Sequence, residues 1–288
     1  MRYIYIFFSI LVWEACAQNV KELEADSVSE IAVVDNELMI INPLGKTIAT
    51  RFNTPLGFQR EQSDSTSYAF YLRHLPLKKH GSLVLYYDGT VKDNFNVYDA
   101  VVDLEIGKRD LHQCADAIMR LRAEYLWNQK QYTNIHFNFT NGFRVEYSEW
   151  MKGRRMVVKG NKTYWNTRNS PSNTYQDFWN YMELIFNYAG TLSLSKELKS
   201  IPISELQIGD IFIKGGSPGH AVTVVDVAKN KEGQKLFLLA QSYMPAQEVQ
   251  ILKNPNNSNS PWYAVENCKS GLETPEWGFR EGSLKRFK

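Results

Sequence analysis

The chain contains 288 residues, of which 43% are hydrophobic, 22% charged and 13% aromatic. These values are typical of folded globular proteins, and they exclude a disordered, collagen-like or coiled-coil chain. The 33 basic and 31 acidic residues nearly cancel and form no long run of one sign, so the composition does not favour nucleic-acid binding.

The first residues have the pattern of an export signal. An apolar stretch that ends at Trp13 is too short for the roughly 20 residues of a membrane-spanning helix, and small residues follow at 15–17. We therefore expect a signal peptide over residues 1–17 and an exported mature protein, periplasmic or extracellular, with no transmembrane span. Cys16 leaves an alternative, in which this cysteine is lipid-modified and anchors the protein to the outer membrane.

Residues 18–95 contain short hydrophobic runs separated by turn residues, and they predict a β-rich N-terminal extension. The runs lie at 30–34, 38–42, 68–72 and 83–87. No flexible linker divides the chain after this extension. We expect residues 18–288 to form a single α+β domain, with the core over 96–288.

A helix is predicted from about Asp110 to Trp127. Asp110 and Gln113 form a helix-start pattern, and hydrophobic residues recur behind them at spacings of three and four. Cys114 lies in the first turn of this helix.

The rest of the chain is predicted to contain several strands and one more helix. A hairpin is expected around the turn Asn141-Gly142, a long surface loop over 149–171, and a helix over 175–188. Three strands complete the pattern, at 208–213, 220–227 and 236–241.

One set of residues has the chemistry of an activated thiol. The N-terminus of a helix favours an anion, so its position predicts a lowered pKa for the Cys114 thiol. His220 begins a buried strand after a glycine-rich bend and is the candidate base. Pairing across the turn at 230–233 places Gln241 on the same side as His220, within hydrogen-bond reach of its ring; a register shifted by one residue would place Ser242 there instead. Asp226 lies about 20 Å along the same strand and is too far away to orient that ring.

The segment 209–226, with its Gly-Asp and Gly-His pairs, resembles the strand pair of NlpC-type papain-like cysteine hydrolases. In that superfamily a cysteine at a helix start precedes a histidine on a strand and a polar residue on the next strand, which is the order of Cys114, His220 and Gln241. The resemblance implies a papain-like (NlpC-type) core, with a helix packed on an antiparallel sheet. The chain also resembles an uncharacterised bacterial family, domain of unknown function 4846, in the runs 109–117, 219–221, 240–247 and 260–263.

These features together predict an exported cysteine hydrolase, an amidase or peptidase acting on cell-wall peptide or a related amide. The substrate class follows from the resemblance and from the export signal alone. Cys114 attacks the carbonyl, His220 transfers the proton, Gln241 holds the imidazole, and N–H groups near Cys114 stabilise the oxyanion. The sequence has no pattern typical of a metal site or a phosphate-binding loop, so neither a metal nor a nucleotide cofactor is indicated.

A non-catalytic function is the alternative. The two cysteines that remain after export, Cys114 and Cys268, are most simply paired as a disulfide in an oxidising compartment. A bridged sulfur cannot attack a carbonyl. In this interpretation the protein is a binding or scaffold protein for glycan or peptide on a papain-like frame, and the Trp-rich stretch at 150–170 holds the ligand.

Overall fold

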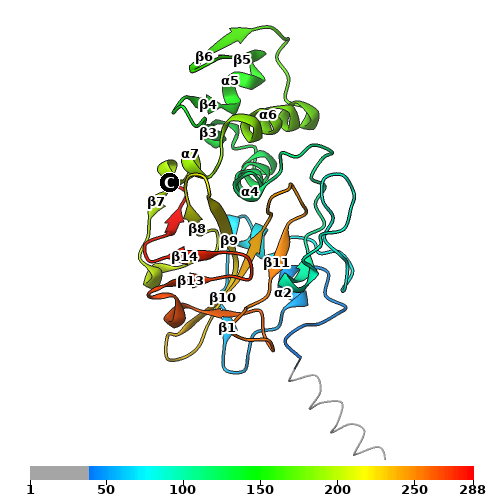
Figure 1. The fold of residues 1–288 in the computed structure, drawn as a ribbon, viewed down its shortest axis with the longest axis vertical. Helices are drawn as coiled ribbons and strands as arrows, with labels where there is room; N and C mark the ends of the chain where they lie inside the picture. Colours follow the sequence, from blue (N-terminus) through cyan, green and yellow to red (C-terminus); the bar gives the residue numbers. More distant parts are fainter. Residues whose placement is uncertain (1–38) are drawn as a thin grey trace, which may run out of the picture. The chain divides into compact units, whose positions relative to one another are not determined.

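An antiparallel sheet forms the centre of the described structure, residues 39–288 of a computed structural model (Figure 1). Its main path runs β2-β11-β10-β9-β8-β15-β7, while β1 pairs with β9 and β12 pairs with β10. Residues 41–288 belong to one compact unit. The strands are β1 (Gln59–Arg60), β2 (Tyr98–Val101), β7 (Lys199–Ser200), β8 (Ile211–Lys214), β9 (His220–Lys229), β10 (Lys235–Gln241), β11 (Gln250–Leu252), β12 (Tyr263–Ala264) and β15 (Leu284–Arg286).

The predicted signal peptide and Cys16 lie outside the described residues, as does the run at 30–34. Over residues 39–288, no helix combines the length and the apolar composition needed to cross a bilayer.

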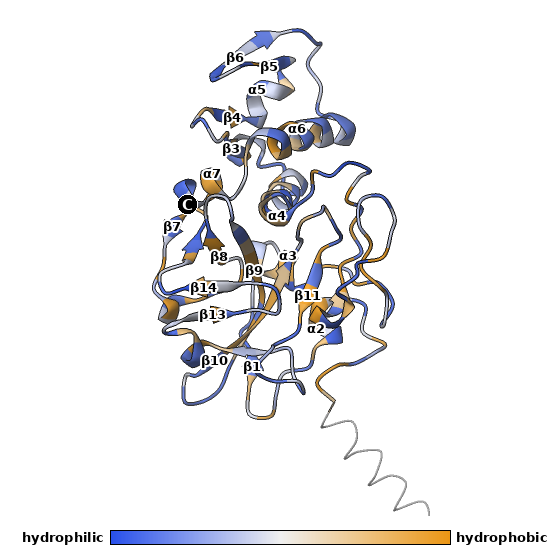
Figure 2. Ribbon diagram, in the orientation of Figure 1, coloured by the Kyte–Doolittle hydropathy of each residue, from blue (hydrophilic) through white to orange (hydrophobic). Residues whose placement is uncertain are grey.

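Both faces of the central strands are covered, which explains why β9 is one continuous buried run. On one face, Ala221 belongs to a hydrophobic cluster with Ile118 of α4 (Cys114–Asn128). On the other, Val222 packs in a cluster with Phe279 of the hairpin β13 (Gly271–Glu273) and β14 (Gly278–Arg280). Figure 2 shows hydrophobic colour along the central strands. Burial from two sides fixes the position of β9, and therefore of His220 at its first residue.

Helix α4 begins at Cys114, four residues later than the helix expected from Asp110. The Asp110 carboxylate accepts instead from the Gln113 amide at 3.0 Å and from the Ala246 N–H at 2.7 Å, so it holds a loop. Asp116 stabilises the helix start, because its carboxylate accepts a hydrogen bond from the Gln113 N–H at 3.0 Å.

A small layer beyond α4 contains the predicted hairpin and second helix. The hairpin is β3 (His136–Asn138) and β4 (Arg144–Glu146), and α6 (Tyr175–Tyr188) begins where the Thr174 hydroxyl accepts from the Asp177 N–H at 3.2 Å. Both predictions are confirmed. The remaining short elements are α7 (Thr191–Glu197) and the 3-10 turns η1 (Phe95–Val97), η2 (Tyr132–Asn134), η3 (Ile203–Glu205) and η4 (Val265–Cys268).

The prediction of a long surface loop at 149–171 is wrong. This stretch contains the end of α5 (Tyr147–Met151) and a hairpin of β5 (Arg154–Lys159) and β6 (Lys162–Thr167). β6 is largely hydrophilic (Figure 2), which hid the strand pattern. Trp150 is only 7% exposed beneath the Arg155 guanidinium, 4.0 Å from its ring centre, so this ring packs within the fold.

The prediction of a β-rich extension is also wrong for residues 39–95. That segment contains the helices α2 (Ile48–Arg51) and α3 (Tyr68–Arg73), and its only strand, β1, has two residues. The run at 68–72 becomes helical because the Ser67 hydroxyl accepts from the Phe70 N–H at 3.1 Å. The run at 83–87 makes only isolated bridges.

Candidate active site

The first residue of β9 and the last residue of β10 meet through their side chains. A β-bulge after Leu238 shifts the pairing, so that Ala240 lies opposite Thr223, the register expected from the sequence. Gln241 Oε1 then lies 2.8 Å from His220 Nε2. The predicted hydrogen bond between these two side chains is confirmed.

The hydrogen bonds behind Gln241 fix which way its amide points. Gln241 Nε2 donates to Glu276 Oε2 at 2.7 Å, and the Lys92 ammonium donates to the same oxygen at 2.8 Å. Because an ionised carboxylate only accepts, the amide NH₂ must face Glu276 and the amide oxygen must face His220. His220 therefore carries its proton on Nε2, and the lone pair of Nδ1 is left to act as a base.

The His220 ring is enclosed by three aromatic side chains. Its centre lies 4.7 Å from Tyr243, 5.4 Å from Trp277 and 5.9 Å from Phe279. Burial lowers the pKa of His220 to about 4, opposed by the hydrogen bond to Gln241 and reinforced by the Lys92 charge. The imidazole is consequently neutral at physiological pH.

Cys114 is the first residue of α4 and is 7% exposed. The N–H of Ala221, the residue after His220, bonds to its sulfur and lowers the pKa, as does the N–H of Ala115. Burial outweighs these donors and, with the nearby Asp116 carboxyl, raises the pKa of the Cys114 thiol to about 11. The expectation that the helix N-terminus lowers this pKa is therefore wrong, because desolvation is the larger effect.

An open pocket of about 340 Å³ borders Cys114. The bend 216–219, directly before His220, forms one wall, and Thr191 of α7 lies beside it. A Cβ on Gly219 would lie 2.4 Å from the Thr191 hydroxyl and 2.4 Å from the Gly216 carbonyl oxygen. Glycine is thus needed there for the tight packing of the bend, while the pocket gives a ligand access to the start of α4.

The start of α4 also places backbone N–H donors near the pocket. The first N–H groups of any α-helix have no partner within that helix. Those of Cys114 and Ala115 lie at this position beside the pocket. They are suited to a carbonyl oxygen that gains negative charge.

The two cysteines of residues 39–288 are free thiols, so the disulfide alternative is wrong for this structure. Cys268 belongs to the cluster on the far face of the sheet, where its Sγ donates to the Ala264 carbonyl at 3.4 Å. α4, with Cys114, covers the opposite face. Asp226, which we excluded by distance, accepts instead from Arg60 and Arg73, each at 2.6 Å.

Sequence reasoning missed four residues that hold or enclose the His220 ring. Lys92 and Glu276 lie 184 positions apart, and Glu276 is in a polar turn typical of a surface. Trp277 and Phe279 resembled ordinary packing aromatics. No local pattern marks any of them. Among residues 39–288, no group of three or more His, Cys, Asp or Glu side chains is arranged to hold a metal ion.

Comparison with known proteins places the chain in a family. No curated protein and no solved structure matches it. The family model described as Domain of unknown function (4846) matches residues 48–286, which include α4, β9 and β10. The chain belongs to this family.

Proposed function

We propose that this protein is an exported cysteine hydrolase with a papain-like (NlpC-type) core, acting as an amidase or peptidase. The proposal is carried by the chain of hydrogen bonds from His220 through Gln241 to Glu276, together with a thiol at a helix start that interacts with the N–H of Ala221, the residue after His220. A neutral imidazole whose tautomer is fixed, with the lone pair at Nδ1, is the form that a general base needs.

The reaction begins with proton transfer from sulfur to nitrogen. Cys114 Sγ attacks the amide carbonyl carbon while its proton passes to His220 Nδ1, and the carbonyl oxygen becomes an oxyanion near the N–H groups of Cys114 and Ala115. Nδ1 then protonates the leaving nitrogen as the C–N bond breaks, which leaves a thioester. Water attacks the thioester, gives its proton to Nδ1, and releases the acid as that proton returns to sulfur.

The raised pKa of Cys114 and the lowered pKa of His220 define the resting state as a neutral pair. Thiolate and imidazolium form together only as the substrate carbonyl is attacked. Gln241 and Glu276 support this step, because a protonated ring donates a stronger, charge-assisted hydrogen bond to the Gln241 oxygen.

The substrate class and the location rest on the sequence. The resemblance to NlpC-type enzymes and the export signal favour cell-wall peptide or a related amide in the periplasm or outside the cell. The open pocket beside Cys114, about 340 Å³, is within the size range of ligand sites and large enough for part of a peptide.

The test compares two cysteine variants. The purified protein is incubated with muropeptides, and released fragments and a thioester on the Cys114 peptide are followed by mass spectrometry. Cys114→Ala should abolish both signals, whereas Cys268→Ala, which changes the other buried free thiol, should keep them. Equal activity in both variants, or no cleavage of any muropeptide or model amide by the parent, would refute the proposal.

The raised pKa of the Cys114 thiol favours one other candidate, a non-catalytic protein that binds peptide or glycan on the same frame. Such a protein would retain muropeptides in a binding assay, with the same affinity for the parent and for Cys114→Ala, and would release no fragments.

A further inference from the structure

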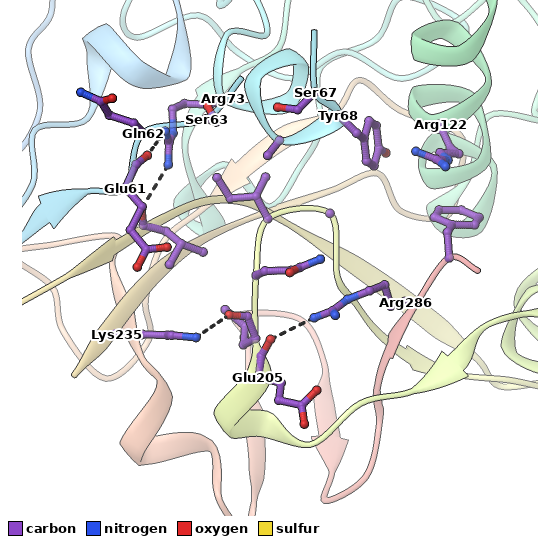
Figure 3. A pocket seen from close by; sticks show the side chains of 17 residues that line it. Glu61, Gln62, Ser63, Ser67, Tyr68, Arg73, Arg122, Glu205, Lys235 and Arg286 are labelled. Atoms are coloured by element: carbon purple, nitrogen blue, oxygen red, sulfur yellow. Dashed lines mark hydrogen bonds between the residues drawn. The ribbon is translucent and has the colours of Figure 1, made fainter. Parts of the chain in front are cut away.

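A second pocket, of about 500 Å³, lies between α3, α4 and the turn before β8. It shares no lining residue with the pocket at Cys114. Arg122 of α4 lies about 12 Å from Cys114 along the helix axis. The charged side chains that line this second pocket include four cations and two carboxylates, Arg73, Arg122, Lys235, Arg286, Glu61 and Glu205 (Figure 3).

Three of the four cations already have partners within the fold. Arg73 donates to the buried Asp226 at 2.6 Å, and Arg286 donates to the buried Asp210 at 2.6 and 2.9 Å. The Lys235 ammonium donates to two backbone carbonyl oxygens at 3.0 and 3.3 Å. These side chains hold the walls of the pocket.

Arg122 differs from the other three cations. Its guanidinium carbon lies 5.0 Å from the ring centre of Tyr68 and 5.6 Å from those of Tyr125 and Phe287. Within residues 39–288 its N–H groups make no hydrogen bond and no ion pair with the protein. Figure 3 shows the guanidinium beside the Tyr68 ring. The rings restrain the guanidinium and leave its donors for a ligand.

The residues around Arg122 indicate what charge the ligand carries and that the rest of the ligand is apolar. A planar guanidinium matches a carboxylate through two parallel N–H···O bonds. Leu206, Ile208 and Val227 add apolar surface to the lining. Glu61 and Glu205 disfavour a ligand with a second negative charge. We propose that this pocket binds a small organic monocarboxylate with an apolar body, whose carboxylate group pairs with Arg122.

This inference is independent of the hydrolase proposal, because it uses no residue of the Cys114 pocket. The probe is N-acetyl-leucine, and its uncharged counterpart is N-acetyl-leucinamide. Binding is followed by ¹⁵N–¹H spectra of arginine Nε–H groups in the purified protein, with the Arg122 signal assigned by its loss in Arg122→Lys.

We expect N-acetyl-leucine to shift the Arg122 signal in a saturable manner and the amide to leave it unchanged. Isothermal titration should show that Arg122→Gln weakens binding about ten- to hundredfold, the effect of losing a charge-assisted hydrogen-bond pair. Ala69→Glu, which adds a carboxylate to the pocket lining, should also abolish binding. The exposed Arg168→Gln should bind as the parent does.

Three results would overturn the assignment. These are no saturable shift with the carboxylate, equal affinity for the carboxylate and the amide, and unchanged affinity in both Arg122→Gln and Ala69→Glu. Inorganic phosphate is the further arm of the test. Tighter binding of phosphate than of N-acetyl-leucine at Arg122 would show an oxyanion site of a different kind.

Discussion

The neutral His220 ring predicts an acid-sensitive contribution to stability. Burial lowers its pKa to about 4 in the folded protein, whereas an unfolded chain has the ordinary value near 6.5. Between these values the unfolded chain binds the proton and the native protein does not, so acid favours unfolding. The contribution is fully present above pH 6.5 and is lost as the pH falls toward 4. From pH 7 to pH 4.5 the loss is about 2 to 3 kcal/mol.

The measurement compares the parent with His220→Gln. Urea denaturation at pH 7 and pH 4.5 gives the free energy of unfolding of each protein. The parent should lose about 2 to 3 kcal/mol more than the variant over this interval. Other buried groups, such as His112, whose pKa is lowered to about 3, titrate in both proteins and cancel in the difference. Equal losses, or an NMR titration of the His220 ring with a midpoint near 6.5, would show that the ring is not buried as a neutral base.

Three further predictions follow from the same contacts. Glu276→Gln should lower kcat about ten- to hundredfold with little change in KM, because an amide at 276 can donate as well as accept and no longer forces the Gln241 NH₂ to face it. A proportional rise in KM alone would point to substrate binding instead. Peptide mass mapping should show that iodoacetamide alkylates Cys114 at pH 7 about 10 to 100 times more slowly than it alkylates glutathione, and that the rate rises toward pH 10. A rate at pH 7 equal to that of glutathione would contradict the raised pKa. Asp226→Asn should lower the free energy of unfolding by about 3 to 5 kcal/mol, since it leaves Arg73 buried without its carboxylate, whereas Glu61→Gln, at an exposed position, should change it by less than about 0.5 kcal/mol. Similar denaturation midpoints for the two variants would exclude this role of Asp226.

The elements that could be predicted from the sequence have strong local patterns. The helix at 175–188 has a cap and a long hydrophobic stripe, and β9 and β10 are joined by a short turn that fixes their pairing. This pairing was enough to place Gln241 beside His220. The run at 68–72 was ambiguous, because five residues are too few to separate a helical from a strand pattern, and the Ser67 cap decided the outcome.

The chemistry of the site depends on packing that the sequence does not reveal. The helix start at Cys114 was visible in the sequence, but the pKa of the thiol is set by the side chains that exclude water from it. The Glu276 carboxylate behind Gln241 lies in a turn between β13 and β14, and only the return of that hairpin onto the sheet brings it there. The direction of the pKa shift therefore required the tertiary structure.

The segment 39–95 has a physical role in the arrangement around His220. Its Lys92 is 2% exposed and donates to the Glu276 oxygen that also holds Gln241, so it holds that carboxylate in place. Arg73, from the same segment, pairs with Asp226 farther along β9. A core truncated to 96–288 would leave Glu276 and Asp226 without these cations. The family match covers residues 48–286 and so includes both cations.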